Sequence, residues 1–171
     1  MAAIFLFHSG CLGARIRTDA SNLASVPLGV TTLKPGAPYY IYSPAWNLYL
    51  GVQSDSTWIE GYPMGLNGTN YVWTYRVDVN GSEYLEIYSA DTAENMWMCV
   101  TSAAADTVSL EGSPGAWEKL NITNPKGDAN FCIFGTANLM YVCLYQSGSY
   151  FYLQRESTCG AWETFQFIPV Q

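Results

Sequence analysis

Gly115-Ala116-Trp117-Glu118 is repeated 45 residues later in the chain as Gly160-Ala161-Trp162-Glu163. Two other groups of mostly apolar segments recur with nearly the same spacing: 41–43, 87–89 and 133–135, then 48–52, 96–100 and 140–144. Tyr75, Leu120 and Phe165 follow the same period, one near the end of each unit. A period of this size indicates that one supersecondary unit is repeated three times along the chain.

Short apolar runs predict four strands in each repeat. Gly, Asn, Asp, Ser and Pro separate the runs, and helical periodicity is absent from the sequence. The predicted strands are 39–43, 48–53, 57–61 and 71–79, then 84–89, 96–102, 107–111 and 117–123, then 131–135, 140–145, 150–154 and 162–169. Twelve such strands are typical of the all-β fold called the β-trefoil, in which six strands close a barrel and six form three hairpins that cap it. We therefore predict a β-trefoil domain over 39–171, with repeats of about 39–80, 81–125 and 126–171.

The alternation within the strands also predicts the core, because every second residue of a strand points to the same side. The first, third and fifth residues of each second strand should fill the barrel with three further positions that recur in every repeat. The predicted core is Ile41, Leu48, Leu50, Val52, Tyr75, Ile87, Met96, Met98, Val100, Leu120, Ile133, Met140, Val142, Leu144 and Phe165. Tyr49, Trp97 and Tyr141 should face outward or pack under the hairpins.

Residues 1–38 precede the repeats and form an N-terminal arm with an apolar start at 2–7. Chain ends are ordered only when they dock on something. We expect this arm to dock on its own barrel or on a neighbouring subunit. The second arrangement would make the protein a building block of an assembly.

The charge of the chain argues against nucleic acid as a partner. The net charge is −7, only 12% of the residues are charged, and there are three lysines. Binding to a phosphate backbone requires Lys and Arg, so we expect no nucleic-acid partner. No apolar run approaches the ~20 residues that cross a bilayer, and segment 2–7 is too short for a clear signal peptide. The sequence predicts no membrane span and leaves the compartment unassigned.

Five cysteines are present, an odd number with no CxxC pair and no zinc-ligand spacing. Cys99 and Cys143 hold the same place in their repeats, within apolar strands, so we expect both to be buried thiols. On this basis the cysteines are predicted to be reduced, which fits either a cytoplasmic protein or one that is released as part of an assembly.

The Gly-Ala-Trp-Glu motifs, each followed by an alternating strand, resemble the fascin-like branch of the β-trefoils. The resemblance spans 39–171 and is carried by the second and third repeats. The first repeat departs from it, since Val72 or Trp73 stands where the Trp should be. The Gln-x-Trp mark of ricin-type lectins is absent. Members of the fascin-like branch include actin bundlers and sugar-binding modules, so the resemblance implies a fold and leaves the function open.

The sequence does not support a catalytic, metal or cofactor site. His8 is the only histidine and lies away from the repeats. Glu83 with Glu86, and Asp91 with Glu94, are close pairs of a kind common in turns and strand edges. Glu118 and Glu163 are expected to accept backbone N–H groups across the repeat boundary. Trp117 and Trp162 are expected to anchor the hairpins. We therefore predict a protein without enzymatic activity.

A binding site is predicted where the first repeat departs from the others. Its last connection, 61–70, is longer than in the other repeats, and enlarged loops on a rigid barrel commonly carry function. Aromatic faces stack on sugars while Asn and Asp bind hydroxyl groups. The candidates are Trp46, Asp55, Trp58, Tyr62, Asn67 and Trp73, with a second cluster in the third repeat at Tyr145, Ser147, Tyr150 and Tyr152. The alternative is that this loop only fills space or packs on the arm.

Three functions follow from these observations. The first is a lectin-like module that binds a glycan or a glycoprotein surface. The second is a structural or interaction subunit, such as a virion or filament surface protein, that uses residues 1–38. The third, actin binding, rests on resemblance alone, and the acidity of the chain opposes association with acidic actin.

Overall fold

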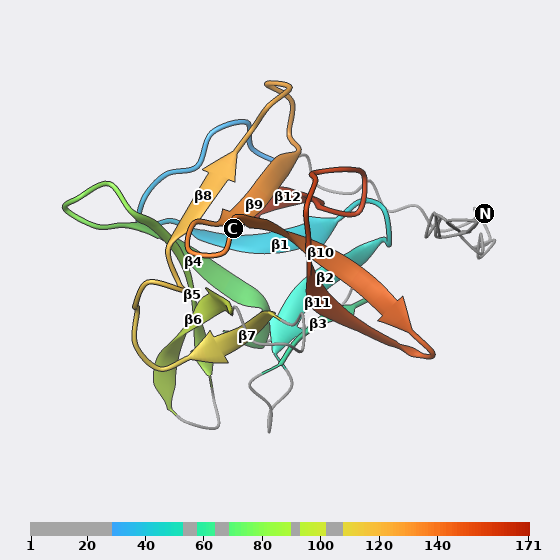
Figure 1. Cartoon of the computed structure of the whole chain (residues 1–171), viewed down its shortest axis with the longest axis horizontal. Coiled ribbons are helices and arrows are strands. Elements are labelled where there is room, and N and C mark those ends of the chain that lie inside the picture. Colours follow the sequence, from blue (N-terminus) through green and yellow to red (C-terminus); the bar gives the residue numbers. More distant parts are fainter. Residues whose placement is uncertain (1–28, 53–57, 64–68, 90–92, 102–107) are drawn as a thin grey trace, which may run out of the picture.

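A computed structural model of the chain describes residues 29–52, 58–63, 69–89, 93–101 and 108–171. Twelve strands and one short 3-10 helix, η1 (Thr69–Tyr71), lie in these ranges (Figure 1). The strands are β1 (Pro38–Ser43), β2 (Leu48–Val52), β3 (Ile59–Tyr62), β4 (Val72–Val77), β5 (Glu83–Ser89), β6 (Glu94–Val100), β7 (Val108–Glu111), β8 (Leu120–Thr123), β9 (Phe131–Gly135), β10 (Met140–Ser147), β11 (Tyr150–Glu156) and β12 (Thr164–Pro169). The twelve predicted strands are confirmed, with ends that shift by up to three residues. No helix in the described part of the chain has the length and hydropathy needed to cross a bilayer.

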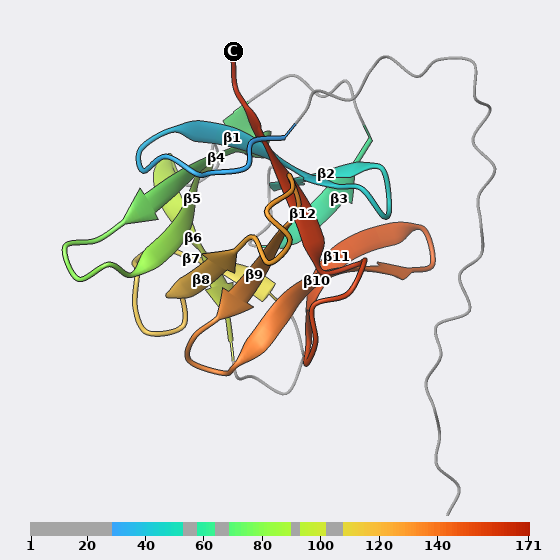
Figure 2. The same ribbon diagram turned by 90° about the horizontal axis from the view of Figure 1, so that it is seen from above.

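Six strands close a barrel. β1 pairs with β4, β4 with β5, β5 with β8, β8 with β9, β9 with β12, and β12 returns to β1, all antiparallel. Figure 2 shows these strands arranged around a common centre. Closure leaves these six strands without a free edge along their paired lengths.

The other six strands form three hairpins, one per repeat: β2–β3, β6–β7 and β10–β11. Each hairpin continues from a barrel strand through pairing of its first strand with β1, β5 or β9. The hairpins also touch one another, since Tyr152 of β11 pairs with Glu60 of β3, and Trp58 pairs with Ser109 of β7. Because β7 and β11 also contact each other, each of the three hairpins touches the other two.

The predicted core is confirmed at every position except one. The core residues form one buried cluster, and Met140 alone among the predicted set is only half-buried. Tyr49, Trp97 and Tyr141 are half-buried and pack edgewise or tilted against Tyr42, Tyr84 and Phe134. These three rings cover the outside of the sheet, as the alternation predicted.

The three repeats share a turn that the sequence did not predict. Asn47, Ala93 and Leu139 have φ angles of 57°, 54° and 58°. They stand 46 residues apart, just before or at the start of the second strand of each repeat. Residues other than glycine seldom adopt a positive φ angle. Because this conformation recurs at the same place in all three repeats, the backbone of the turn is the same in each repeat although the side chain differs.

The end of the predicted arm is tied to its own barrel. The Val30 N–H donates to the carbonyl of Phe167 at 2.9 Å, and the Gly36 N–H donates to that of Tyr75 at 2.8 Å. Val30 and Leu33 pack against the core cluster. Residues 29–37 therefore dock within the same chain, while residues 1–28 lie outside the described part.

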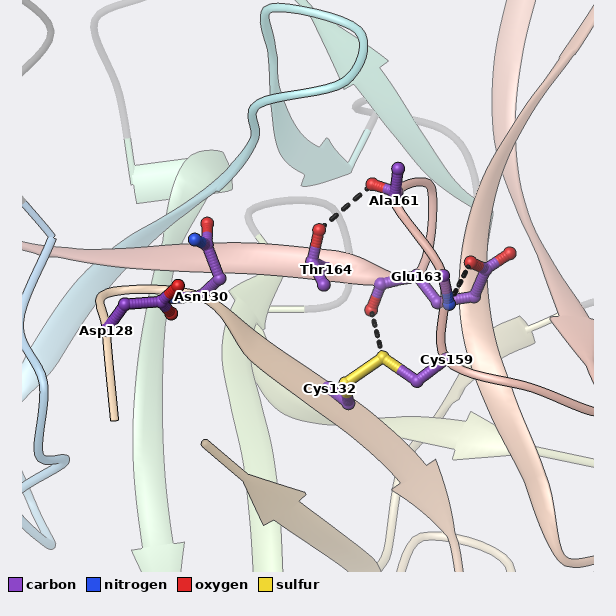
Figure 3. Close-up of a disulfide and its surroundings, with 8 residues drawn as sticks. Asp128, Asn130, Cys132, Cys159, Ala161, Glu163 and Thr164 are labelled. Atoms are coloured by element: carbon purple, nitrogen blue, oxygen red, sulfur yellow. Dashed lines mark hydrogen bonds between the residues drawn. A yellow bond between two sulfur atoms is a disulfide. The ribbon is translucent and has the colours of Figure 1, made fainter. Parts of the chain in front are cut away.

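The prediction of reduced cysteines is wrong for one pair, because Cys132 and Cys159 form a disulfide (Figure 3). Their Cα atoms are 6.1 Å apart, within the range that a disulfide bridges. This disulfide could not be predicted from sequence, because Cys159 lies in a loop. The pairing of Thr164 in β12 with Cys132 in β9 brings the two cysteines together. Cys99 and Cys143 are buried thiols, as predicted.

Candidate functional site

The repeated Gly-Ala-Trp-Glu motif forms a turn that closes on itself. Glu118 Oε2 accepts the N–H of Gly115 at 2.6 Å. Glu163, which is labelled in Figure 3, accepts the N–H of Gly160 through Oε2 at 2.7 Å. Both carboxylates are nearly buried. The expected structural role of the two acids is confirmed, but each bond lies within its own turn and does not cross the repeat boundary.

Trp162 and Trp117 differ in their surroundings. Trp162 packs against Trp46 with ring centroids 5.1 Å apart, and Trp46 also meets Phe151 at 5.3 Å. Trp162 is therefore an anchor, as predicted. Trp117 is 37% exposed, so the prediction that it anchors a hairpin is not confirmed.

The first repeat replaces this turn with an aromatic ring. Cys99 and Cys143 of the other repeats correspond to Gly51, and a Cβ added to Gly51 would overlap the ring of Tyr71. In the second repeat, burial raises the pKa of the Cys99 thiol, and the neighbouring Glu118 carboxylate raises it further. The ring of Tyr71 thus lies over Gly51 of β2 as the carboxylate of Glu118 lies beside Cys99 of β6. Only a glycine at position 51 leaves room for the ring.

Two of the predicted ligand residues are structural. Trp73 is 0% exposed and its indole N–H donates to the carbonyl of Leu50 at 3.0 Å, so it is a core residue and the prediction that it binds a ligand is wrong. Trp46 is half-buried against Phe151 and Trp162 and packs on the core cluster. Both aromatic residues support the hairpins from within.

An aromatic residue, an acid and a second aromatic residue follow one another on the outward side of β3 and of the bridge residue before it. Ile59 is fully buried, and a Cβ on Gly61 would meet the side chains of Leu48, Leu144 and Phe151 at 3.0 to 3.1 Å, so these two positions face inward. The alternation of the strand therefore turns Trp58, Glu60 and Tyr62 outward. Trp58 is 48% exposed, and Glu60 and Tyr62 are half-buried.

The two predicted clusters meet at this strand. Glu60 lies opposite Tyr152 of β11, and Tyr152 lies opposite Tyr145 of β10. On the other side, Glu60 lies opposite Gly51, which Tyr71 covers. Figure 1 shows the β2–β3 and β10–β11 hairpins side by side. We call the outward set Trp58, Glu60, Tyr62, Tyr71, Tyr145 and Tyr152 the β3 face.

Ring contacts and hydrogen bonds hold the β3 face in place. Tyr62 and Tyr71 meet edge to face at 5.3 Å, and Tyr145 and Tyr152 at 5.8 Å. The Tyr62 hydroxyl donates to Glu60 Oε2 at 3.1 Å. Burial raises the pKa of Tyr71, so its phenol stays protonated at neutral pH and can donate a hydrogen bond.

This arrangement combines apolar ring surface with fixed hydrogen-bonding groups. Tyrosine and tryptophan present an apolar body and a polar edge, while the carboxyl oxygens of Glu60 accept hydrogen bonds. Such a surface suits a ligand that has both C–H faces and hydroxyl groups.

The remaining predicted candidates lie at the border of this face or beyond the described residues. Tyr150 is 69% exposed on β11 and has the same parity as Tyr152. Asp55 and Asn67 lie outside the described residues. Glu60 and Tyr71 were missed by sequence reasoning. The signal for Glu60 was its place between Trp58 and Tyr62 in the alternation, and the signal for Tyr71 was the glycine at position 51.

Glu83 and Glu86, one of the two acidic pairs considered from sequence, have structural partners, while Asp91 of the other pair lies outside the described residues. Glu83 accepts the Tyr75 hydroxyl and the N–H of Ile122, the latter at 2.7 Å. Glu86 forms an ion pair with Arg76 at 2.7 Å. No group of three or more His, Cys, Asp or Glu side chains within the described ranges is arranged to hold a metal ion.

Comparison with known proteins supports the fold. No protein-family model and no curated protein matches the sequence. Among solved structures, the chain is similar to a ricin B-like lectin of Macrolepiota procera in complex with lactose, at 19% identity and a TM-score of 0.65, over 81% of this chain and 99% of that one. The fold is a β-trefoil.

Two further similar structures agree with this assignment. The designed threefold-symmetric protein ThreeFoil aligns at 14% identity and a TM-score of 0.63, over 78% of this chain and 99% of that chain. SeviL bound to asialo-GM1 saccharide aligns at 10% identity and a TM-score of 0.62, over 80% of this chain and 99% of that chain. At these identities the similarity concerns the fold alone.

Proposed function

We propose that the protein is a non-enzymatic carbohydrate-binding module and that the β3 face binds the sugar. The observation that carries the proposal is the pairing of β3 with β11. It brings Glu60 opposite Tyr152 and so joins the aromatic residues of the first and third repeats around one carboxylate. Two similar β-trefoils were solved with a sugar bound, lactose in one and the asialo-GM1 saccharide in the other.

The chemistry of the face agrees with this ligand class. A pyranose ring offers an apolar C–H face and hydroxyl groups on its edge, which match aromatic rings and a carboxylate acceptor, respectively. The face is also held rigid by ring contacts and by the bond from Tyr62 to Glu60. Preorganisation of this kind lowers the entropy that binding must overcome.

A glycan array with the purified chain tests the proposal. The Tyr62→Ala and Glu60→Gln variants should each lose at least about tenfold in affinity for the best glycan, because each removes a stacking surface or a charged acceptor. The matched control is Trp117→Ala, which removes an exposed tryptophan from the second repeat and should leave binding unchanged. Circular dichroism and thermal unfolding check that the variants fold. Absence of any bound glycan from a broad array would refute the proposal.

A structural or interaction subunit remains the alternative function. It depends on the arm, residues 1–38, of which 1–28 lie outside the described part of the chain. The described end of the arm, 29–37, docks on its own barrel. Deletion of residues 1–28 tests this alternative: a changed sedimentation coefficient beyond the lost mass would support it, and unchanged sedimentation would count against it.

The fascin-like resemblance stays a proposal that rests on the two Gly-Ala-Trp-Glu motifs of the sequence. Actin binding is the least supported function, because the net charge of −7 opposes an acidic partner. Co-sedimentation with filaments at low salt tests it directly.

A further inference from the structure

Resting on the proposed carbohydrate function, we infer that the ligand is an extended, uncharged oligosaccharide that lies along β3. In this arrangement Trp58 and Tyr62 stack on different sugar residues. Glu60 accepts hydroxyl groups of the sugar between them. The inference names a ligand class, and it depends on three properties of the β3 face: its length, its width and its charge.

The length comes from the strand. Trp58 forms a bridge directly before β3, and Tyr62 is four residues further along the same extended segment. A strand rises about 3.3 Å per residue, so the two aromatic residues are roughly 13 Å apart along it. One pyranose ring is too short to contact both. A ligand that uses both aromatic residues must therefore contain several sugar residues in an extended chain.

The width comes from the neighbouring strands. Gly51 and Tyr152 are the cross-strand partners of Glu60, and strands lie about 4.8 Å apart. Tyr71 fills the space above Gly51, and Tyr152 stands on the other side. The two phenol rings flank the carboxylate, so a sugar chain bound to Glu60 is directed along the strand. A branch on this sugar chain would collide with Tyr71 or Tyr152.

The charge comes from Glu60. It is the one charged side chain among the six residues of the β3 face, and the whole chain has a net charge of −7. A sialic acid carboxylate or a sulfate placed on this strand would meet a carboxylate at short range, where like charges repel even near a protein surface. Hydroxyl groups, in contrast, donate to the same oxygens. The face should therefore discriminate against acidic glycans.

The experiment uses a glycan array, with the full chain, in which neutral oligosaccharides of one to six residues are matched with sialylated and sulfated derivatives. The best glycan should be neutral and contain at least three residues. Its truncation to a monosaccharide should weaken binding by at least about tenfold, and each acidic derivative should bind at least about tenfold more weakly at low salt. Raising the salt should narrow the second difference, since salt screens repulsion.

Two variants separate the effect of oligosaccharide length on affinity from the effect of ligand charge. In Trp58→Ala, the gain in affinity from the shortest to the longest oligosaccharide should largely disappear, while the preference for neutral sugars stays. In Glu60→Gln, the discrimination against acidic derivatives should shrink, while the dependence on length stays. Trp117→Ala is again the matched control, and thermal unfolding verifies that all variants fold.

The outcomes distinguish this inference from the proposed function. If glycans bind through Tyr62 but affinity does not depend on chain length, or acidic glycans bind best, the inference is overturned and the carbohydrate function stands. If no glycan binds at all, the proposed function fails and the inference fails with it.

Discussion

Removal of the Cys132–Cys159 disulfide should destabilise the protein by several kcal/mol. The bond closes a loop of 27 residues. Loop-closure entropy for this length predicts a loss of about 3.5 kcal/mol in the free energy of unfolding at 25 °C. For a chain of this size, the loss corresponds to a fall in melting temperature of roughly 7 to 14 °C. The double variant Cys132→Ala/Cys159→Ala is preferred to serine, because Cys132 is buried and a serine hydroxyl there would need a partner.

Urea denaturation of the wild type and the double variant measures the loss. The midpoint should fall by roughly 1 to 2 M. A phosphine reductant should lower the wild-type midpoint by a similar amount and leave the double variant unchanged, which controls for the side chains removed. A loss below about 1 kcal/mol would refute the loop-closure reasoning. Alkylation of Cys132 in the unfolded, unreduced protein would refute the disulfide itself.

Three further predictions concern the turns and the core. Gly51→Ala should push the ring of Tyr71 aside, lower the free energy of unfolding by about 1 to 3 kcal/mol and weaken glycan binding. Urea unfolding and ligand titration measure the two effects, and an unchanged free energy of unfolding would show that the ring moves freely. Glu118→Ala leaves the N–H of its turn without an acceptor and should lose about 1 to 3 kcal/mol, more than Glu118→Gln loses; equal losses would contradict this role. Burial raises the pKa of Tyr75, and its bond to Glu83 raises it further. Folded protein thus keeps a proton that unfolded protein releases above pH 10, so unfolding free energy should fall with rising pH there, and less steeply in Tyr75→Phe; identical slopes would refute this.

The sequence predicted the scaffold well because period and alternation are local signals. Twelve strands and almost the entire core follow from which residues recur and which alternate. The strand ends were less well predicted. The second and third repeats begin their last strand at Leu120 and Thr164, three and two residues later than expected, because the Gly-Ala-Trp-Glu residues form a closed turn before it.

The site was harder to predict, because it depends on contacts between repeats. Tyr62 and Tyr152 were recognised separately, but only the pairing of β3 with β11 shows that they share one surface. Trp73 was misassigned because sequence cannot tell an exposed tryptophan from one that binds a strand carbonyl inside the core. Cys132 and Cys159 were misassigned for a related reason, since their approach depends on the pairing of distant segments.

The exchange at Gly51 and Tyr71 limits how this chain can change one residue at a time. A side chain at position 51 collides with the ring, and loss of the ring leaves an unfilled hollow over the glycine. An evolutionary path between this arrangement and the Cys99/Glu118 arrangement therefore passes through a less stable protein unless both positions change together. The same coupling sets a rule for engineering. A tyrosine can be placed over the second strand of another repeat only if the residue beneath it becomes glycine in the same step, because a Cβ at that position would overlap the ring.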